Sequence, residues 1–177
     1  MKGVVLAAGD GGRLRPLTEF TPKVLLEAGG HPLIHYPIEA LRLAGVTDIA
    51  VVVGYLGKRV RSAVQAIHPQ LTIIENEQYE EGLALSVFAA RSFVGDDPFV
   101  LCMGDHPISS DIPQRVLSNG HTGSALCVDW GAKLSCQVND GTRVLVDPNG
   151  PTNHGMLDPV RIVAELGSIT NAVFPAA

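Results

Sequence analysis

The sequence predicts an α/β fold built as a three-layer αβα sandwich, with a mostly parallel sheet and a C-terminal antiparallel ribbon. Strand-like apolar runs alternate with helix-like segments as far as Asp105. Alternation at this spacing indicates right-handed βαβ units, whose parallel sheet is covered by helices on both faces. After about residue 120, short strand-like pieces separated by turn residues replace this pattern, which favours an antiparallel ribbon. Together these observations indicate a Rossmann-like sandwich.

The first element is a strand at residues 2–7, because this continuous run of Val and Leu ends in a glycine cluster and so resembles a buried parallel strand. The segment 32–43 has apolar residues at helical spacing and is predicted to be an amphipathic helix. Pro32 suits a first helical position, and Gly45 follows the last turn. The same reasoning predicts strands at 48–53, 71–74 and 98–103 and helices at 57–67 and 84–94.

The C-terminal part is predicted as a ribbon followed by a tail. The ribbon strands are expected at 124–129, 133–138 and 143–146, around turns such as Asn139-Asp140-Gly141. From 148 to 156 the chain is rich in Pro, Gly and Asn, and only 160–166 regains a regular pattern. We therefore expect a nucleotide-binding domain at 1–147 and an irregular tail at 148–177.

Composition argues against a nucleic-acid-binding, membrane-spanning or disulfide-rich protein. The chain has 46% hydrophobic and 18% charged residues and a net charge of -5, so no general attraction to nucleic acid or anionic membranes is expected. No apolar run is long enough to span a membrane, and we expect a cytoplasmic protein. Cys102, Cys127 and Cys136 lack a CxxC spacing and are interpreted as reduced packing residues.

A glycine cluster follows the first strand directly, in the run from Leu6 to Leu14, LAAGDGGRL. Glycine lets the backbone approach a ligand closely, so that consecutive N–H groups can point at a phosphate. The alternative is an ordinary turn. The dinucleotide pattern GxGxxG fails because Leu14 occupies its last glycine position, and no Gly-Lys-Ser/Thr of a P-loop follows.

The continuation of this loop carries a family resemblance. After Arg13-Leu14 come Pro16-Leu17-Thr18 and then Pro22-Lys23-Val24-Leu25-Leu26. The whole run resembles the signature of the nucleotidyltransferases that activate sugar phosphates and related alcohol phosphates. The similarity continues through Gly29, Pro32-Leu33-Ile34 and Gly54-Tyr55, over roughly the first 110 residues.

The resemblance implies roles for individual residues. The glycine loop would hold the triphosphate of a nucleoside triphosphate (NTP), while Arg13 and Lys23 would neutralise charge on the transferring phosphate. Phosphoryl-type transfer depends on such positioning and cations. The alternative for both is a solvated surface charge. The implied nucleotide-binding residues are Leu6, Ala7, Ala8, Gly9, Gly11, Gly12, Arg13, Lys23, Gly82, Ser86 and Gly104.

A second constellation runs from Asn76 to Val87, NEQYEEGLALSV. Its Asn, Tyr, Gly82 and Ser86 resemble the segment through which the cytidylyltransferases of inositol phosphate or phosphocholine enclose base and substrate. Those enzymes often carry Asn where this chain has Leu83, so the implied base preference is only a lean toward CTP. The acidic residues of the segment are interpreted as a solvent-exposed loop: Glu77, Glu80 and Glu81.

A third element is Asp105, which follows a buried strand and Gly104. Mg²⁺ prefers one or two carboxylates together with phosphate oxygens and waters, so Asp105 is the predicted metal ligand and third catalytic residue. The alternative is a turn aspartate that caps the next helix. The Gly-Asp-His sequence through His106 also resembles the inositol-phosphate cytidylyltransferases, but His106 is given no catalytic role.

Members of the nucleotidyltransferase family that this sequence resembles usually bind their metal with a second aspartate, on a strand that returns to the sheet. Neither Asp147 nor Asp158 is a convincing candidate, and 161–167 and 171–174 resemble that returning ribbon only faintly. Two hypotheses remain open. The chain is an enzyme that joins an NTP to a small phosphorylated acceptor, or it is a truncated, catalytically inactive nucleotide-binding module. In the second case the tail is a remnant of the C-terminal part.

We also expect self-association through uncovered strand edges near 125–128 or 162–166.

Overall fold

The structure is a computed structural model that describes residues 1–118, 124–127 and 172–174. Within these residues, the main sheet has six strands in the order β5-β4-β1-β6-β8-β7. The first four of these are parallel, and β8 is antiparallel to both of its neighbours. Their bounds are Lys2–Ala7 for β1, Asp48–Val53 for β4, Thr72–Glu75 for β5, Phe99–Met103 for β6, Ala125–Leu126 for β7 and Ala172–Phe174 for β8.

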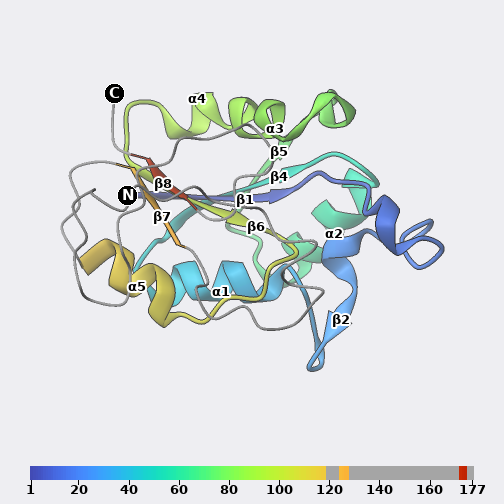
Figure 1. Ribbon diagram of the computed structural model, residues 1–177, viewed down its shortest axis with the longest axis horizontal. Coiled ribbons are helices and arrows are strands. Elements are labelled where there is room, and N and C mark those ends of the chain that lie inside the picture. Colours follow the sequence, from blue (N-terminus) through green and yellow to red (C-terminus); the bar gives the residue numbers. More distant parts are fainter. Residues whose placement is uncertain (119–123, 128–171, 175–177) are drawn as a thin grey trace, which may run out of the picture.

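Helices cover both faces of this sheet (Figure 1). One face carries α1 (His35–Leu43), α2 (Gly57–Ile67) and α5 (Asp111–Ser118), and the other carries α3 (Leu83–Ala89) and α4 (Arg91–Val94). The predicted Rossmann-like αβα sandwich with a mostly parallel sheet is therefore confirmed. No helix among the described residues is long and apolar enough to cross a membrane.

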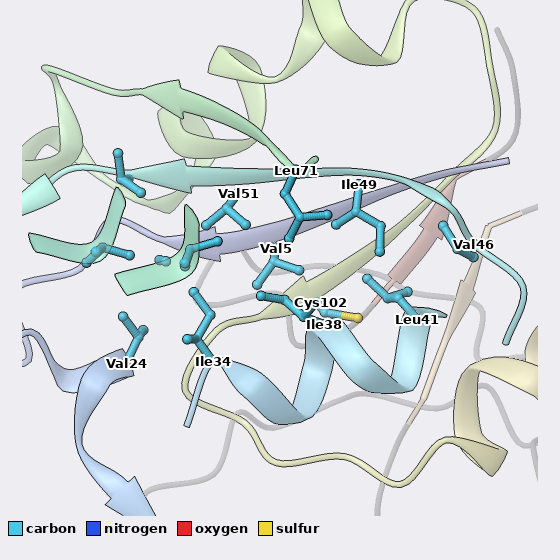
Figure 2. Close-up of a cluster of buried hydrophobic side chains, with 14 of the residues drawn as sticks. Val5, Val24, Ile34, Ile38, Leu41, Val46, Ile49, Val51, Leu71 and Cys102 are labelled. Atoms are coloured by element: carbon cyan, nitrogen blue, oxygen red, sulfur yellow. The ribbon is translucent and has the colours of Figure 1, made fainter. Parts of the chain in front are cut away.

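The alternation of side chains along the central strand explains the two layers of core. Val5 and Ala7 of β1 belong to the cluster with α1 and α2 (Figure 2), whereas Val4 and Leu6 belong to the cluster with α3 and α4. All four are at most 4% exposed. A strand buried on both faces must be apolar at every position, which is why β1 appears in the sequence as a continuous hydrophobic run.

Several helix boundaries differ from those predicted. The helix expected to begin at Pro32 begins at His35, because β2 (Glu27–Ala28) and β3 (His31–Pro32) pair as a small antiparallel sheet. The helix expected at 84–94 is divided at Ala90 into α3 and α4. Helix α5 was not predicted.

The C-terminal segments are described only in part. Of the predicted ribbon, β7 overlaps the strand expected at 124–129, while 133–138, 143–146 and 160–166 lie outside the described residues, as do Cys136, Asp147 and Asp158. β8 lies between β6 and β7, so 172–174 adds a strand within the segment expected to be an irregular tail. Among the described residues, β7 is the last strand at this side of the sheet, and it lies at one of the two places where an uncovered edge was expected.

Candidate functional site

A pocket of about 480 Å³ opens at the carboxyl ends of β1 and β6. We call it the glycine-loop pocket. It has the size of a typical small-molecule site, and its position is where open α/β sheets bind ligands. Its lining residues are Leu6, Ala7, Ala8, Gly9, Asp10, Gly11, Gly12, Arg13, Leu14, Lys23, Val24, Leu83, Ser86, Met103 and Asp105.

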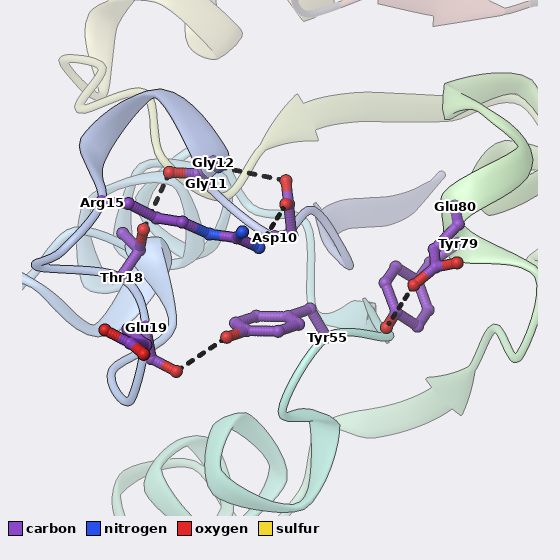
Figure 3. Close-up of polar contacts among 9 residues, drawn as sticks. All are labelled: Asp10, Gly11, Gly12, Arg15, Thr18, Glu19, Tyr55, Tyr79 and Glu80. Atoms are coloured by element: carbon purple, nitrogen blue, oxygen red, sulfur yellow. Dashed lines mark hydrogen bonds and ion pairs between the residues drawn. The ribbon is translucent and has the colours of Figure 1, made fainter.

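The glycine loop is held in shape by local hydrogen bonds (Figure 3). Thr18, which is fully buried, donates from Oγ1 to the carbonyl of Gly11 at 2.8 Å. Asp10 accepts from the backbone N–H of Gly12 at 3.1 Å and from Arg15 Nη2 at 3.1 Å. Gly11 has φ +64, and a Cβ there would lie 3.0 Å from side-chain atoms of Thr18 and Lys23. Glycine is therefore required at this turn for both conformation and space.

Lys23 reaches the pocket from a short 3-10 helix, η2 (Lys23–Leu25). Val24 anchors that helix, because its side chain is buried in the core and its carbonyl accepts from Ile34 N at 2.9 Å. Lys23 Nζ lies 2.5 Å from Asp105 Oδ2, with the two side chains 28% and 17% exposed. The structure thus brings together two predicted catalytic residues that are far apart in the sequence. Arg13, the third, also lines the pocket and is exposed.

Gly104 places Asp105 at the end of β6. Its N–H donates to the carbonyl of Leu6 at 2.8 Å, and a Cβ on Gly104 would lie 2.8 Å from that same oxygen. Gly104 is thus packed against β1 and is not among the residues that line the pocket. His106 Nε2 lies 3.8 Å from Asp105 Oδ1.

Ser86 lines the pocket from α3 and is buried. Its Oγ accepts from Asn76 Nδ2 at 3.0 Å, and the Asn76 backbone N–H donates to Val53 O at 2.8 Å. Ser86 is thereby fixed to the end of β4. Gly82 has φ +126 and precedes α3 directly, but it does not line the pocket. The three acidic residues of this segment are exposed, in agreement with a solvent-facing loop: Glu77, Glu80 and Glu81.

Several residues that line the pocket were not predicted as site residues from the sequence. Asp10 lies within the glycine loop, so its position alone could have suggested it. Leu83 and Met103 contribute apolar wall from α3 and the end of β6. Leu83 lies in the segment that resembles cytidylyltransferases, whereas no motif marks Met103. Beside the pocket, Tyr55 donates from its hydroxyl to Glu19 O at 2.8 Å, and its ring meets that of Tyr79 edge to face at 6.5 Å (Figure 3).

The pocket contains carboxylates, the type of ligand that a hard divalent cation prefers. Asp105 and Asp10 both line it, and Asp105 is mostly buried. Mg²⁺ needs only one or two carboxylates when phosphate oxygens and waters complete its shell. In this structure Lys23 neutralises Asp105, so a cation and the ammonium group would share the same carboxylate.

Comparison with known proteins identifies the family. The model of the MobA-like NTP transferase domain matches residues 3–146. A glucose-1-phosphate thymidylyltransferase of Streptomyces antibioticus is 38% identical over 119 residues, which cover 66% of this chain and 33% of that protein. A 2-aminoethylphosphonate cytidylyltransferase of Lancefieldella rimae is 32% identical over 160 residues, covering 87% of this chain and 63% of that protein.

A solved structure is similar over nearly the whole chain. The inositol-1-phosphate CTP transferase of T. maritima has a TM-score of 0.77 at 25% identity, covering 98% of this chain and 70% of that one. The chain spans about a third of the length of the first of its curated relatives. Because the family match extends over the strands and loops that build the pocket, the chain belongs to the family of MobA-like NTP transferase domains.

Proposed function

We propose that this chain transfers a nucleoside monophosphate from an NTP to a phosphorylated sugar or alcohol and releases pyrophosphate. The observation that carries the proposal is the convergence of the glycine loop, Lys23 and Asp105 on one pocket. Backbone N–H groups of such a loop are suited to phosphate oxygens. The adjacent ammonium group supplies the positive charge that a triphosphate needs.

The reaction requires a phosphate oxygen of the acceptor to attack the α-phosphorus of the NTP. The new phosphorus–oxygen bond forms as the bond to the bridging oxygen of pyrophosphate breaks, and pyrophosphate carries away the electron pair. Lys23 and Arg13 stabilise the negative charge of the transferring group, and the glycine loop holds the triphosphate. Mg²⁺, bound by Asp105, would neutralise phosphate charge when present.

We propose that the NTP used by this chain is CTP. Asn76 and Ser86 are hydrogen-bonded and buried beside the pocket, in the segment that resembles cytidylyltransferases. Two proteins that are similar over most of this chain are a 2-aminoethylphosphonate cytidylyltransferase and an inositol-1-phosphate CTP transferase. Other relatives are thymidylyl- and guanylyltransferases, so the base preference needs its own measurement.

A pyrophosphate-release screen tests both levels of the proposal. Each of the four NTPs is offered with Mg²⁺ and a panel of sugar phosphates, alcohol phosphates and phosphonates. We expect release that depends on both substrates and is fastest with CTP. Faster release with another NTP would reject the CTP preference alone. NTP binding by calorimetry without any release would favour the inactive binding module, and no heat with any NTP would reject nucleotide binding altogether.

A further inference from the structure

Outside the glycine-loop pocket, three potential metal ligands converge. His35 and Glu39 lie on α1, and His68 follows the last residue of α2. Each offers one ligand atom, and these atoms all lie within 4.8 Å of one another. His35 and Glu39 are four residues apart, so one face of the helix presents both. None of the three lines the glycine-loop pocket.

His68 is the least expected member of the group. Its side chain is 8% exposed, and its Nε2 atom is buried and has no hydrogen-bond partner among the described residues. The nearest carboxylate oxygen, Glu39 Oε1, is 3.8 Å away, which is too long for a hydrogen bond. A buried polar atom of this kind is costly and calls for a partner, which can be an ion.

We propose that His35, Glu39 and His68 form a binding site for a single transition-metal dication, for which Zn²⁺ is the representative. Two imidazoles and one carboxylate are a common set of three protein ligands for Zn²⁺, with water in the fourth position. Imidazole nitrogens select such ions, whereas Mg²⁺ and Ca²⁺ prefer sites made of oxygen. The site therefore takes a different class of ion from the one proposed at Asp105.

The surroundings suit this chemistry. Burial lowers the pKa of His68, which keeps the imidazole neutral and its lone pair available near pH 7. Arg42 Nη1 lies 2.7 Å from Glu39 Oε1, and a carboxylate has enough lone pairs to keep that bond while it binds an ion. The ring of His31 stacks on that of His35 with centroids 4.2 Å apart and planes inclined by 14°, which restricts the orientation of the His35 ligand.

A metal ion here would join α1 to the end of α2. Both helices pack on the same face of the sheet. An ion that binds only the folded chain stabilises it, by a free energy that grows with the logarithm of the ratio of ion concentration to dissociation constant. The inferred role is structural, and it is independent of the nucleotidyl transfer proposed above.

The test is a titration of the whole chain, free of nucleotide, with Zn²⁺ against a chromophoric chelator. We expect one tightly bound ion per chain and a thermal unfolding midpoint that rises with Zn²⁺. Co²⁺ in its place should give the visible absorption of a four-coordinate site. Glu39→Gln and His35→Asn should each weaken binding by more than about 100-fold, since even indirect partners of a metal contribute 10- to 100-fold.

His31→Ala is the matched control, because His31 touches His35 without belonging to the ligand group. It should lose at most about 10-fold in affinity, much less than the two ligand variants, because His31 only orients His35. Absence of saturable binding would overturn the proposal, as would native affinity in Glu39→Gln. Loss of binding in His31→Ala with binding retained in Glu39→Gln would assign the ion to the stacked pair of His31 and His35 instead and would equally refute the site.

Discussion

Replacing Lys23 with alanine is the sharpest perturbation of the proposed reaction. The substitution removes the ammonium group that lies 2.5 Å from Asp105 in the glycine-loop pocket. If Lys23 stabilises charge on the transferring phosphate, kcat/KM should fall by about 100-fold or more, because loss of one preorganised group typically costs roughly 3 kcal/mol.

The position of Lys23 supports an effect of this size. Its side chain is 28% exposed, so water screens its charge less than it screens a fully exposed lysine. Two unit charges about 4 Å apart interact by about 4 kcal/mol at an effective dielectric constant of about 20. A loss of roughly 3 kcal/mol corresponds to about 150-fold in rate, which lies well within the range of a steady-state assay.

Arg15→Ala is the matched control for this experiment. Arg15 also carries a positive charge in the segment after β1, but it is 56% exposed and does not line the pocket. Its loss removes only the bond to Asp10, so Arg15→Ala should cost much less activity than Lys23→Ala. Pyrophosphate release is measured for both variants, and urea unfolding checks that Lys23→Ala remains folded without the partner of Asp105. Activity in Lys23→Ala equal to that of the native chain would show that Lys23 is a surface charge and would refute the reasoning.

Four further predictions concern single residues. Arg13→Ala should also lower turnover by about 100-fold, and an unchanged rate would remove it from the site. Gly104→Ala should lower the free energy of unfolding by about 1–3 kcal/mol, because its Cβ would lie 2.8 Å from Leu6 O; urea titration that shows native stability would contradict this packing. Leu41→Ala should cost about 2–5 kcal/mol in the same assay, since Leu41 is 0% exposed, and a cost below about 1 kcal/mol would contradict its place in the core. Burial raises the pKa of Cys102 to about 12, so thiolate is scarce in the folded chain at pH 8; peptide mapping after alkylation should find Cys102 modified only in urea, and equal labelling without urea would refute its burial.

The sequence predicted the parallel strands accurately because burial on both faces leaves a strong signal. β1 and β4 are nearly continuous runs of apolar residues, and both have the predicted bounds. Helix ends were harder to place, since their signals are local and compete with other structures. Pro32 suits a first helical turn, but it also fits the edge of the small sheet that it forms with Glu27. Tertiary packing decides between these choices.

Site residues outside recognised motifs, and residues that the fold brings together from distant parts of the sequence, were harder to predict than residues within motifs. Arg13, Lys23 and Asp105 could be proposed because each occupies a position in a recognised run of residues. Met103 lines the same pocket, but its type and spacing resemble those of an ordinary core residue. His68 meets Glu39 only because α2 folds back beside α1 on one face of the sheet. No periodicity along the chain encodes such a meeting.

The glycine-loop pocket depends on hydrogen bonds that extend beyond the ends of its strands. Gly104 N donates to Leu6 O, Tyr55 N donates to Ala8 O at 3.0 Å, and Asn76 N donates to Val53 O at 2.8 Å. The loops after β6, β4 and β5 are thus each joined to a neighbouring strand or to the segment that follows it. Because a displacement of about 1 Å can cost about 100-fold in rate, the geometry of the site rests on these backbone contacts as well as on its charged side chains. A substitution that disturbs them should impair the site even when the altered residue never touches the ligand.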